Sequence, residues 1–174
     1  MNCICVIPSP VGLLTVSSDG VNITGLWIQG QKYFASTLDK LDNNTVACDL
    51  PIFDNVKQWL NCYFSGINPG FTLPLAPKGS PFRQEIWKIL SEIPYGKTIT
   101  YGEIAKIYNS QTQGKRTSPR AVGGAVGHNP ISIIIPCHRV VGADRSLTGY
   151  AGGIHNKIHL LKLENADLLH ESKL

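Results

Sequence analysis

The 174-residue sequence contains no long uninterrupted run of apolar residues. The apolar stretch around Ile133–Ile135 falls well short of the ~20 residues that a membrane-spanning helix needs. The first residues also lack the basic and apolar regions of a secretion signal. We therefore expect an intracellular protein without a membrane partner, located in the cytoplasm, or in the nucleus if the source is a eukaryote.

The five cysteines include no Cys-x-x-Cys pair, and none of the five histidines precedes His128. An odd number of cysteines without regular spacing argues against a disulfide framework in an intracellular chain, so we expect at least one free thiol. The alternative for Cys3, Cys5, Cys48 and Cys62 is a zinc site, but their spacing does not match the usual structural zinc sites. Buried cysteine often serves simply as a small hydrophobic residue.

Acidic residues are missing from the whole segment between Glu103 and Asp144, although the formal net charge of the chain is only +4. The same segment contains the cations Lys106, Lys115, Arg116, Arg120 and Arg139. A basic stripe of this kind suits a polyanionic partner, because neutralised phosphates release counterions. A solvated surface is the alternative, and charge alone favours that alternative.

The first part of the chain has the pattern of strands followed by a helix. We expect strands over residues 3–7, 12–17 and 21–28, with a hairpin at Asp19-Gly20. A helix should begin near Pro51, with Asp49 near its cap, and end at Ser65-Gly66. Residues 66–79 are rich in glycine and proline and predict a linker, which divides the chain into domains 1–78 and 79–174.

The second part predicts three helices, each begun by a capping signal. Ser80-Pro81 should start a helix through Leu90, and a capping box at Thr100–Glu103 should start a helix to about Tyr108. A polar loop over residues 109–117 should then lead to Ser118-Pro119 and a helix over residues 120–127. This pair of short helices is typical of a helix-turn-helix, and Ile133–Ile135 then predicts a buried strand.

The last of these helices contains three glycines, Gly123, Gly124 and Gly127. Each interior glycine costs about 1 kcal/mol of helix stability relative to alanine. A helix with this composition needs a thin face, either to pack tightly on a neighbour or to approach a ligand backbone closely. The glycines alone do not decide between these two explanations.

The run Pro136-Cys137-His138-Arg139-Val140 is the strongest candidate for a reactive site. A histidine and an arginine beside a cysteine favour the ionised form of the thiol, which is the nucleophile. Without further context, a structural cysteine beside a surface histidine would be the better interpretation.

Four segments supply that context: residues 135–142, 147–153, 95–103 and 120–125. Together they resemble the signature of the O6-alkylguanine-DNA alkyltransferases, also called methylated-DNA–protein-cysteine methyltransferases. The resemblance covers residues 80–165, whereas the N-terminal part is similar only in the order of its elements. The loop at residues 109–117 is longer than in most relatives, which leaves its contacts with a DNA backbone open.

The resemblance implies a role for each matching residue of the reaction centre. Cys137 would accept the alkyl group, and His138 would take the thiol proton through a water molecule. Glu164 would orient this histidine, in the manner of a hydrolase triad. Asn129 would brace the active-site turn, and the hydroxyl of Tyr101 would bond the guanine.

The resemblance also implies a DNA-binding surface and an alkyl pocket. Arg120 would enter the base stack in place of the extruded nucleotide, and the helix that carries Ala121, Gly123 and Gly124 would lie in the minor groove. The residues of the alkyl pocket would be Val140, Tyr150 and Ala151. Neither a metal nor a cofactor is implied, and the partner would be double-stranded DNA that carries O6-alkylguanine, bound by a monomer.

The implied fold is α/β (α+β), with a ribonuclease-H-like N-terminal sheet-and-helix domain before a mostly helical domain with a helix-turn-helix. The N-terminal domain would serve as a scaffold. The implied activity is a single transfer of the alkyl group of O6-alkylguanine, with O4-alkylthymine as a further substrate to test. Two alternatives remain: a non-enzymatic alkyltransferase-like DNA-binding module, against which Cys137 argues, and a cysteine hydrolase that turns over repeatedly.

Overall fold

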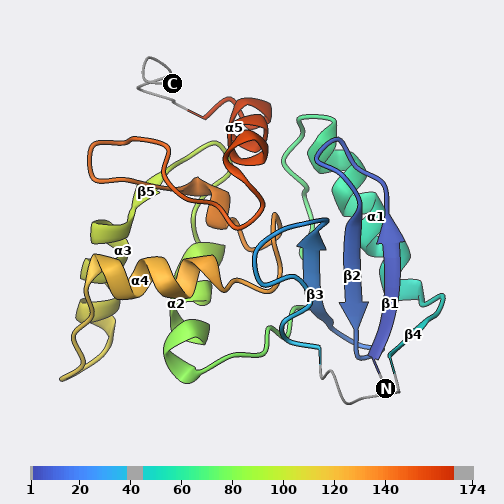
Figure 1. Ribbon diagram of the computed structural model, residues 1–174, viewed down its shortest axis with the longest axis horizontal. Coiled ribbons are helices and arrows are strands. Elements are labelled where there is room, and N and C mark those ends of the chain that lie inside the picture. Colours follow the sequence, from blue (N-terminus) through green and yellow to red (C-terminus); the bar gives the residue numbers. More distant parts are fainter. Residues whose placement is uncertain (1, 39–44, 167–174) are drawn as a thin grey trace.

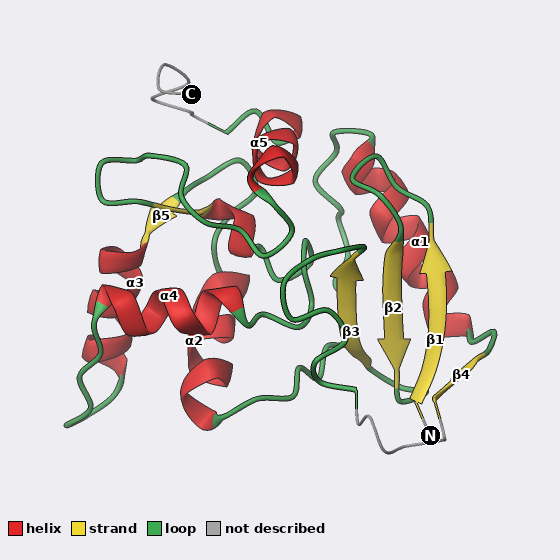
Figure 2. Cartoon of the chain, in the orientation of Figure 1, coloured by secondary structure: helices red, strands yellow, loops and turns green. Residues whose placement is uncertain are grey.

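The computed structural model describes residues 2–38 and 45–166, which form a sheet-containing part and a mostly helical part packed side by side (Figure 1). Figure 2 shows the long strands on one side and most of the helices on the other. The first part contains β1 (Asn2–Ile7), β2 (Leu14–Ser18), β3 (Ile23–Ile28), β4 (Thr45–Ala47) and α1 (Pro51–Phe64). The second contains α2 (Pro81–Ser91), β5 (Ile99–Thr100), α3 (Tyr101–Gln111), α4 (Pro119–Gly127), a 3-10 turn (Cys137–Arg139), β6 (Val140–Val141) and α5 (Ile154–Leu163). This arrangement confirms the expected fold class.

The sheet of the first part has the strand order β3-β2-β1-β4. Strands β1, β2 and β3 pair antiparallel in sequence order, which includes the predicted hairpin at Asp19-Gly20. Strand β4, which the sequence pattern did not indicate, pairs with β1 in parallel. Helix α1 covers one face of this sheet (Figure 1) and buries Ile52, Phe53, Val56, Leu60 and Tyr63. The helix begins after Leu50 without a side-chain cap, so the expected role of Asp49 near the cap is not realised.

The outer edge of β3 joins the two parts. In the segment that connects the two parts, Pro74 O accepts a hydrogen bond from Ile23 N (2.8 Å), and Ala76 N donates one to Ile23 O (2.9 Å). Further along the same edge, Leu26 N donates to Pro130 O (2.9 Å) and Leu26 O accepts from Ser132 N (2.8 Å). Exposed strand edges are open to pairing with other chains, and here segments 74–76 and 130–132 cover the edge.

The predicted helix starts of the second part are confirmed. Ser80 and Ser118 accept a bond from the backbone of their first turns, and Thr100 and Glu103 form the complete capping box. Helix α3 continues to Gln111, three residues beyond the expected end, so the polar loop is shorter than predicted. Within the two described ranges, no helix combines the length and apolar character needed to cross a bilayer.

The expected strand at Ile133–Ile135 is wrong, because this segment is a compact turn. Ile135 N bonds Ile131 O (3.0 Å), and Ile133 has a φ of 71°, which is rare for a β-branched residue. The side chain of Asn129 holds the turn together by donating to Ile135 O (2.8 Å) and accepting from Ile131 N (3.0 Å). A polar residue four positions away therefore overrides the local preference for a strand.

Cys3 and Cys48 form a disulfide bond, which the sequence analysis did not expect. The parallel pairing of β1 with β4 places Cys3 opposite Val46, so Cys48 lies close beyond the end of that pairing. The bond also removes two of the four ligands of the alternative zinc site, while Cys5, Cys62 and Cys137 are free thiols. In the described part of the chain, no three His, Cys, Asp or Glu side chains are placed to hold a metal ion.

The glycines of α4 are not required by packing inside the protein. A Cβ atom built on Gly124 or Gly127 has no heavy atom within 4 Å, and one on Gly123 makes only ordinary contact with the Tyr101 ring at 3.7 Å. In contrast, a Cβ on Gly25 in β3 would lie 1.9 Å from the buried ring of Trp27. The structure therefore favours the second explanation for the thin face of this helix, the close approach of a ligand backbone.

Replacement of Gly124 by alanine should stabilise the protein by about 0.5–1 kcal/mol, because alanine is the better helix former and its methyl group has room. Urea unfolding of Gly124→Ala, with Gly25→Ala as the matched substitution at a crowded site, measures this difference. Gly25→Ala should be strongly destabilised. A loss of stability in Gly124→Ala would mean that packing, and not an external partner, requires the glycine.

Candidate active site

A cavity of about 340 Å³ lies between α4 and the loop around Tyr150. Six of the residues singled out from the sequence line it: Tyr101, Gly123, Gly124, Cys137, Tyr150 and Ala151. The side chain of Cys137 is buried, with only 4% of the residue exposed. The cavity therefore connects the buried thiol to the glycine-rich face of α4.

Three residues predicted for the DNA-binding surface and the alkyl pocket lie outside this cavity. Arg120 and Ala121 are exposed in the first turn of α4. Val140, expected in the alkyl pocket, is completely buried in β6 and does not line the cavity. Its carbonyl oxygen instead accepts a hydrogen bond from the ammonium group of Lys157.

Asn129 connects the active-site turn to the thiol. Besides its bonds to the turn backbone, its Nδ2 donates to the sulfur of Cys137 at 3.1 Å. The residue is 3% exposed and follows directly after α4, where the helix ends at His128. One buried amide thus fixes both the path of the chain and the orientation of the sulfur.

Burial raises the pKa of the Cys137 thiol, while the bond from Asn129 and the charge of Lys157 oppose the increase. The sequence-based expectation that neighbouring His138 and Arg139 favour the ionised form is therefore wrong for the resting protein. The guanidinium of Arg139 is bonded to Glu164 and to the carbonyl of Ile93 (2.6 Å) instead. The thiol is neutral at rest, and its proton has to be removed by a base.

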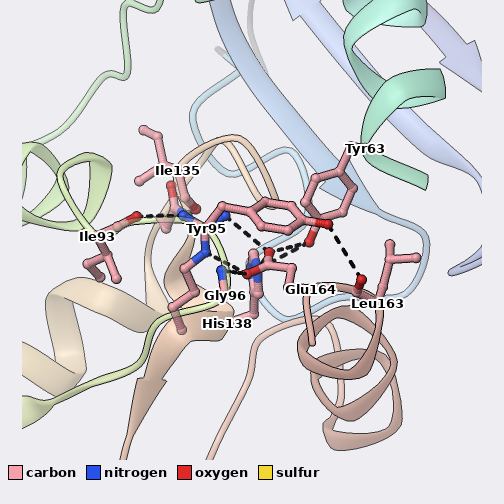
Figure 3. Close-up of polar contacts among 10 residues, drawn as sticks. Tyr63, Ile93, Tyr95, Gly96, Ile135, His138, Leu163 and Glu164 are labelled. Carbon is pink, nitrogen blue, oxygen red and sulfur yellow. Dashed lines mark hydrogen bonds and ion pairs between the residues drawn. The ribbon is translucent and has the colours of Figure 1, made fainter. Parts of the chain in front are cut away.

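The carboxylate of Glu164 is the centre of a buried polar network (Figure 3). It accepts hydrogen bonds from Tyr63 Oη (2.6 Å), His138 Nε2 (2.6 Å) and Gly96 N (3.1 Å). Arg139 adds two further bonds, from Nε (2.9 Å) and Nη2 (3.1 Å). Burial alone would raise the pKa of Glu164, but the hydrogen bond from His138 and the bonds and charge of Arg139 outweigh it and lower this pKa to about 2.

This network determines the protonation state of His138. The ionised carboxylate of Glu164 can only accept a hydrogen bond, so Nε2 of the imidazole carries the proton. The Tyr63 hydroxyl lies 3.2 Å from the same nitrogen. The other ring nitrogen, Nδ1, is buried and has no hydrogen-bond partner among the described residues. Burial lowers the pKa of His138, so the ring is neutral near pH 7 and Nδ1 can accept a proton.

Sequence reasoning missed Tyr63 and Lys157. Tyr63 is completely buried on the inner face of α1, where an aromatic ring is expected for packing alone. Burial also raises its pKa, so its hydroxyl remains a donor. Lys157 is equally buried and donates to the carbonyls of Thr148 (2.7 Å) and Gly149 (3.3 Å) as well as Val140. The sequence spacing could have indicated Lys157, because it lies on the same face of α5 as Leu160 and Leu161. A charged side chain on such a buried face needs polar partners inside the protein.

The N-terminal part also contributes to the cavity, although it was expected to act only as a scaffold. Lys32 and Tyr33, which follow β3, line the same cavity as Cys137. Nothing in their local sequence indicated this, because the contact depends on how the two parts pack together.

The fold and the site define a two-part protein in which a helix-turn-helix lies beside a buried thiol. Two family models match it: the ribonuclease-like domain of 6-O-methylguanine DNA methyltransferase at residues 5–77 and the DNA-binding domain of the same family at residues 81–166. The methylated-DNA–protein-cysteine methyltransferase of Haemophilus influenzae is 46% identical over 159 residues, which are 90% of this chain and 83% of that protein. The chain belongs to this family of methyltransferases.

Other relatives agree over nearly the whole length. The methylated-DNA–protein-cysteine methyltransferase of Methanosarcina barkeri is 42% identical over 164 residues, covering 94% of this chain and 97% of that protein. The crystal structure of Mycobacterium tuberculosis OGT in complex with DNA superposes with a TM-score of 0.79 at 40% identity, covering 96% of this chain and 97% of that one.

The low pKa of Glu164 should make the stability of the protein depend on pH. A carboxyl whose folded pKa is depressed contributes stability above its unfolded pKa, near 4.5, and loses it as pH falls toward its folded pKa, about 2. Urea unfolding of the wild type and Glu164→Gln at pH 7 and pH 3 isolates this contribution. The difference in the free energy of unfolding between the two proteins should be about 2 kcal/mol smaller at pH 3 than at pH 7. An equal difference at both pH values would contradict the network.

Proposed function

We propose that this protein repairs double-stranded DNA by transferring the alkyl group of O6-alkylguanine to its own Cys137. The observation that carries the proposal is the buried thiol of Cys137, which lines a cavity formed by the glycine-rich helix α4. The family of the chain supports the same chemistry. Because the reacting atom is inaccessible in a duplex, the nucleotide must be flipped into this cavity, which costs a few kcal/mol.

The reaction begins with removal of the thiol proton. His138 Nδ1 accepts this proton through one water molecule, and Glu164 stabilises the imidazolium that forms. The thiolate is stabilised by the bond from Asn129 and by the charge of Lys157, both of which lower the pKa of Cys137. The thiol therefore stays protonated at rest and becomes a thiolate only when His138 takes its proton.

The thiolate then displaces guanine from the alkyl carbon. A bond forms between Sγ and the carbon as the bond between this carbon and O6 breaks, and the electron pair of the broken bond remains on guanine. Guanine takes up one proton, in balance with the one lost by the thiol. Tyr101 lines the cavity, and burial raises its pKa, so its hydroxyl remains protonated and can donate to the leaving base.

The product is a thioether, which lacks the carbonyl that allows an acyl-enzyme to be hydrolysed. Each molecule, acting as a monomer, should therefore react once. A cysteine hydrolase would turn over, and an alkyltransferase-like binding module would bind the lesion without any transfer. The stoichiometry of the reaction separates the three functions.

Incubation of the protein with an excess of an oligonucleotide duplex that contains O6-methylguanine should repair at most one lesion per protein molecule. Peptide mass spectrometry should find the mass of one methyl group on the peptide that contains Cys137. Cys137→Ser should bind the duplex and leave it methylated. Repeated turnover without added thiol, or methylation of another residue, would contradict the proposal.

Arg120 is exposed in the first turn of α4, and we infer that it fills the stack when the nucleotide is flipped. Arg120→Ala should therefore slow repair of duplex DNA by tenfold or more, in line with the few kcal/mol that flipping costs. The reaction with free O6-benzylguanine, which requires no flipping, should keep its rate. Equal slowing on both substrates would exclude this role, and Arg116→Ala, at an exposed cation outside α4, is the control.

A further inference from the structure

One wall of the cavity comes from the N-terminal part of the protein, from a segment that we call the Tyr33 loop, residues 31–37. Gln31 anchors its start: the buried amide oxygen accepts bonds from Ile28 N (2.7 Å) and from the hydroxyl of Ser132 (3.0 Å) in the active-site turn. Lys32 N donates to Ala151 O (2.9 Å) on the other side of the cavity. The loop is therefore fixed to two segments of the reaction centre.

The backbone of this loop is held in a conformation that side chains disfavour. Tyr33 has a φ of 60° and Ala35 a φ of 53°, both in the left-handed region. L-residues avoid this region because Cβ approaches the following carbonyl oxygen. Such strain persists only where surrounding contacts impose it, and functional sites are where it concentrates.

The Tyr33 ring makes two contacts with its neighbours. The imidazole of His128 stacks on the ring, with centroids 3.9 Å apart and planes at 20°. The Lys32 ammonium lies over the ring, 5.0 Å from its centroid. His128 is itself fixed at the end of α4 by a bond between Nδ1 and Gly124 O (2.7 Å). A ring that already stacks on His128 is better suited to form a wall of the cavity than to serve as a platform on which a base could stack.

We propose that Tyr33 is a specificity-determining residue, which limits the size of the alkyl group that fits beside Cys137. This inference rests on the proposed alkyl transfer. The cavity, about 340 Å³, lies at the lower end of the ~300–1,000 Å³ typical of small-molecule sites, and both Tyr33 and Cys137 line it. The ring therefore borders the space that the base and its alkyl group would share. The stack on His128 and the hydrogen bonds of Gln31 oppose movement of this wall away from the cavity.

The test compares two lesions in the same oligonucleotide duplex, O6-methylguanine and O6-benzylguanine, so that contacts with the DNA are identical. Tyr33→Ala should increase the ratio of the benzyl rate to the methyl rate by roughly tenfold, the range in which single hydrophobic contacts discriminate. Tyr33→Phe keeps the ring and should retain the wild-type ratio. Phe34→Ala removes an exposed aromatic of the same loop that does not line the cavity, and it should also leave the ratio unchanged.

Tyr33→Gly provides a second variant without the ring, and glycine tolerates the positive φ if alanine prevents folding. An unchanged ratio in the folded variant would overturn the inference. Equal loss of both rates would also overturn it, since the ring would then be a stacking platform. If the wild type itself places no alkyl group on Cys137, the proposed function fails, whereas transfer with an unchanged ratio contradicts only the role of Tyr33.

Discussion

Glu164 places a negative charge where water does not reach it, and the surrounding structure is arranged to satisfy that charge. Its donors come from helix α1, the turn before β5 and the 3-10 turn, so segments far apart in the chain must meet at one carboxylate (Figure 3). Removal of one partner from a buried charged group typically costs 3–5 kcal/mol. The network therefore couples the packing of the two parts to the orientation of His138.

The same coupling explains why the N-terminal part is more than a scaffold. Tyr63 donates to Glu164 from α1, and Tyr33 lines the cavity beside Cys137. The edge of β3 binds residues 130–132, at the start of the active-site turn. The buried network around Glu164, the turn and the cavity wall each depend on contact between the parts, so the proposed reaction centre belongs to the whole molecule.

The sequence predicted the fold class, the first three strands and the helix starts, because these depend on local patterns such as the capping box at Thr100. It also indicated the cavity residues around Cys137, by resemblance. It did not indicate the turn at Ile133–Ile135, because a side chain at Asn129 overrides local propensity, or the disulfide of Cys48, which follows from β4. The contributions of Tyr63 and Lys157 required a three-dimensional arrangement that brings buried polar groups together.

The proposed mechanism requires that Glu164 keep His138 neutral, with the proton on Nε2, so that Nδ1 can accept the thiol proton. Long-range proton–nitrogen NMR correlation on ¹⁵N-histidine-labelled protein at pH 7 measures this directly, with His138 assigned by comparison with a His138→Gln variant. We expect a neutral ring protonated at Nε2 in the wild type, and a changed tautomer population in Glu164→Gln. A ring that is protonated on Nδ1, or doubly protonated at pH 7, would contradict it.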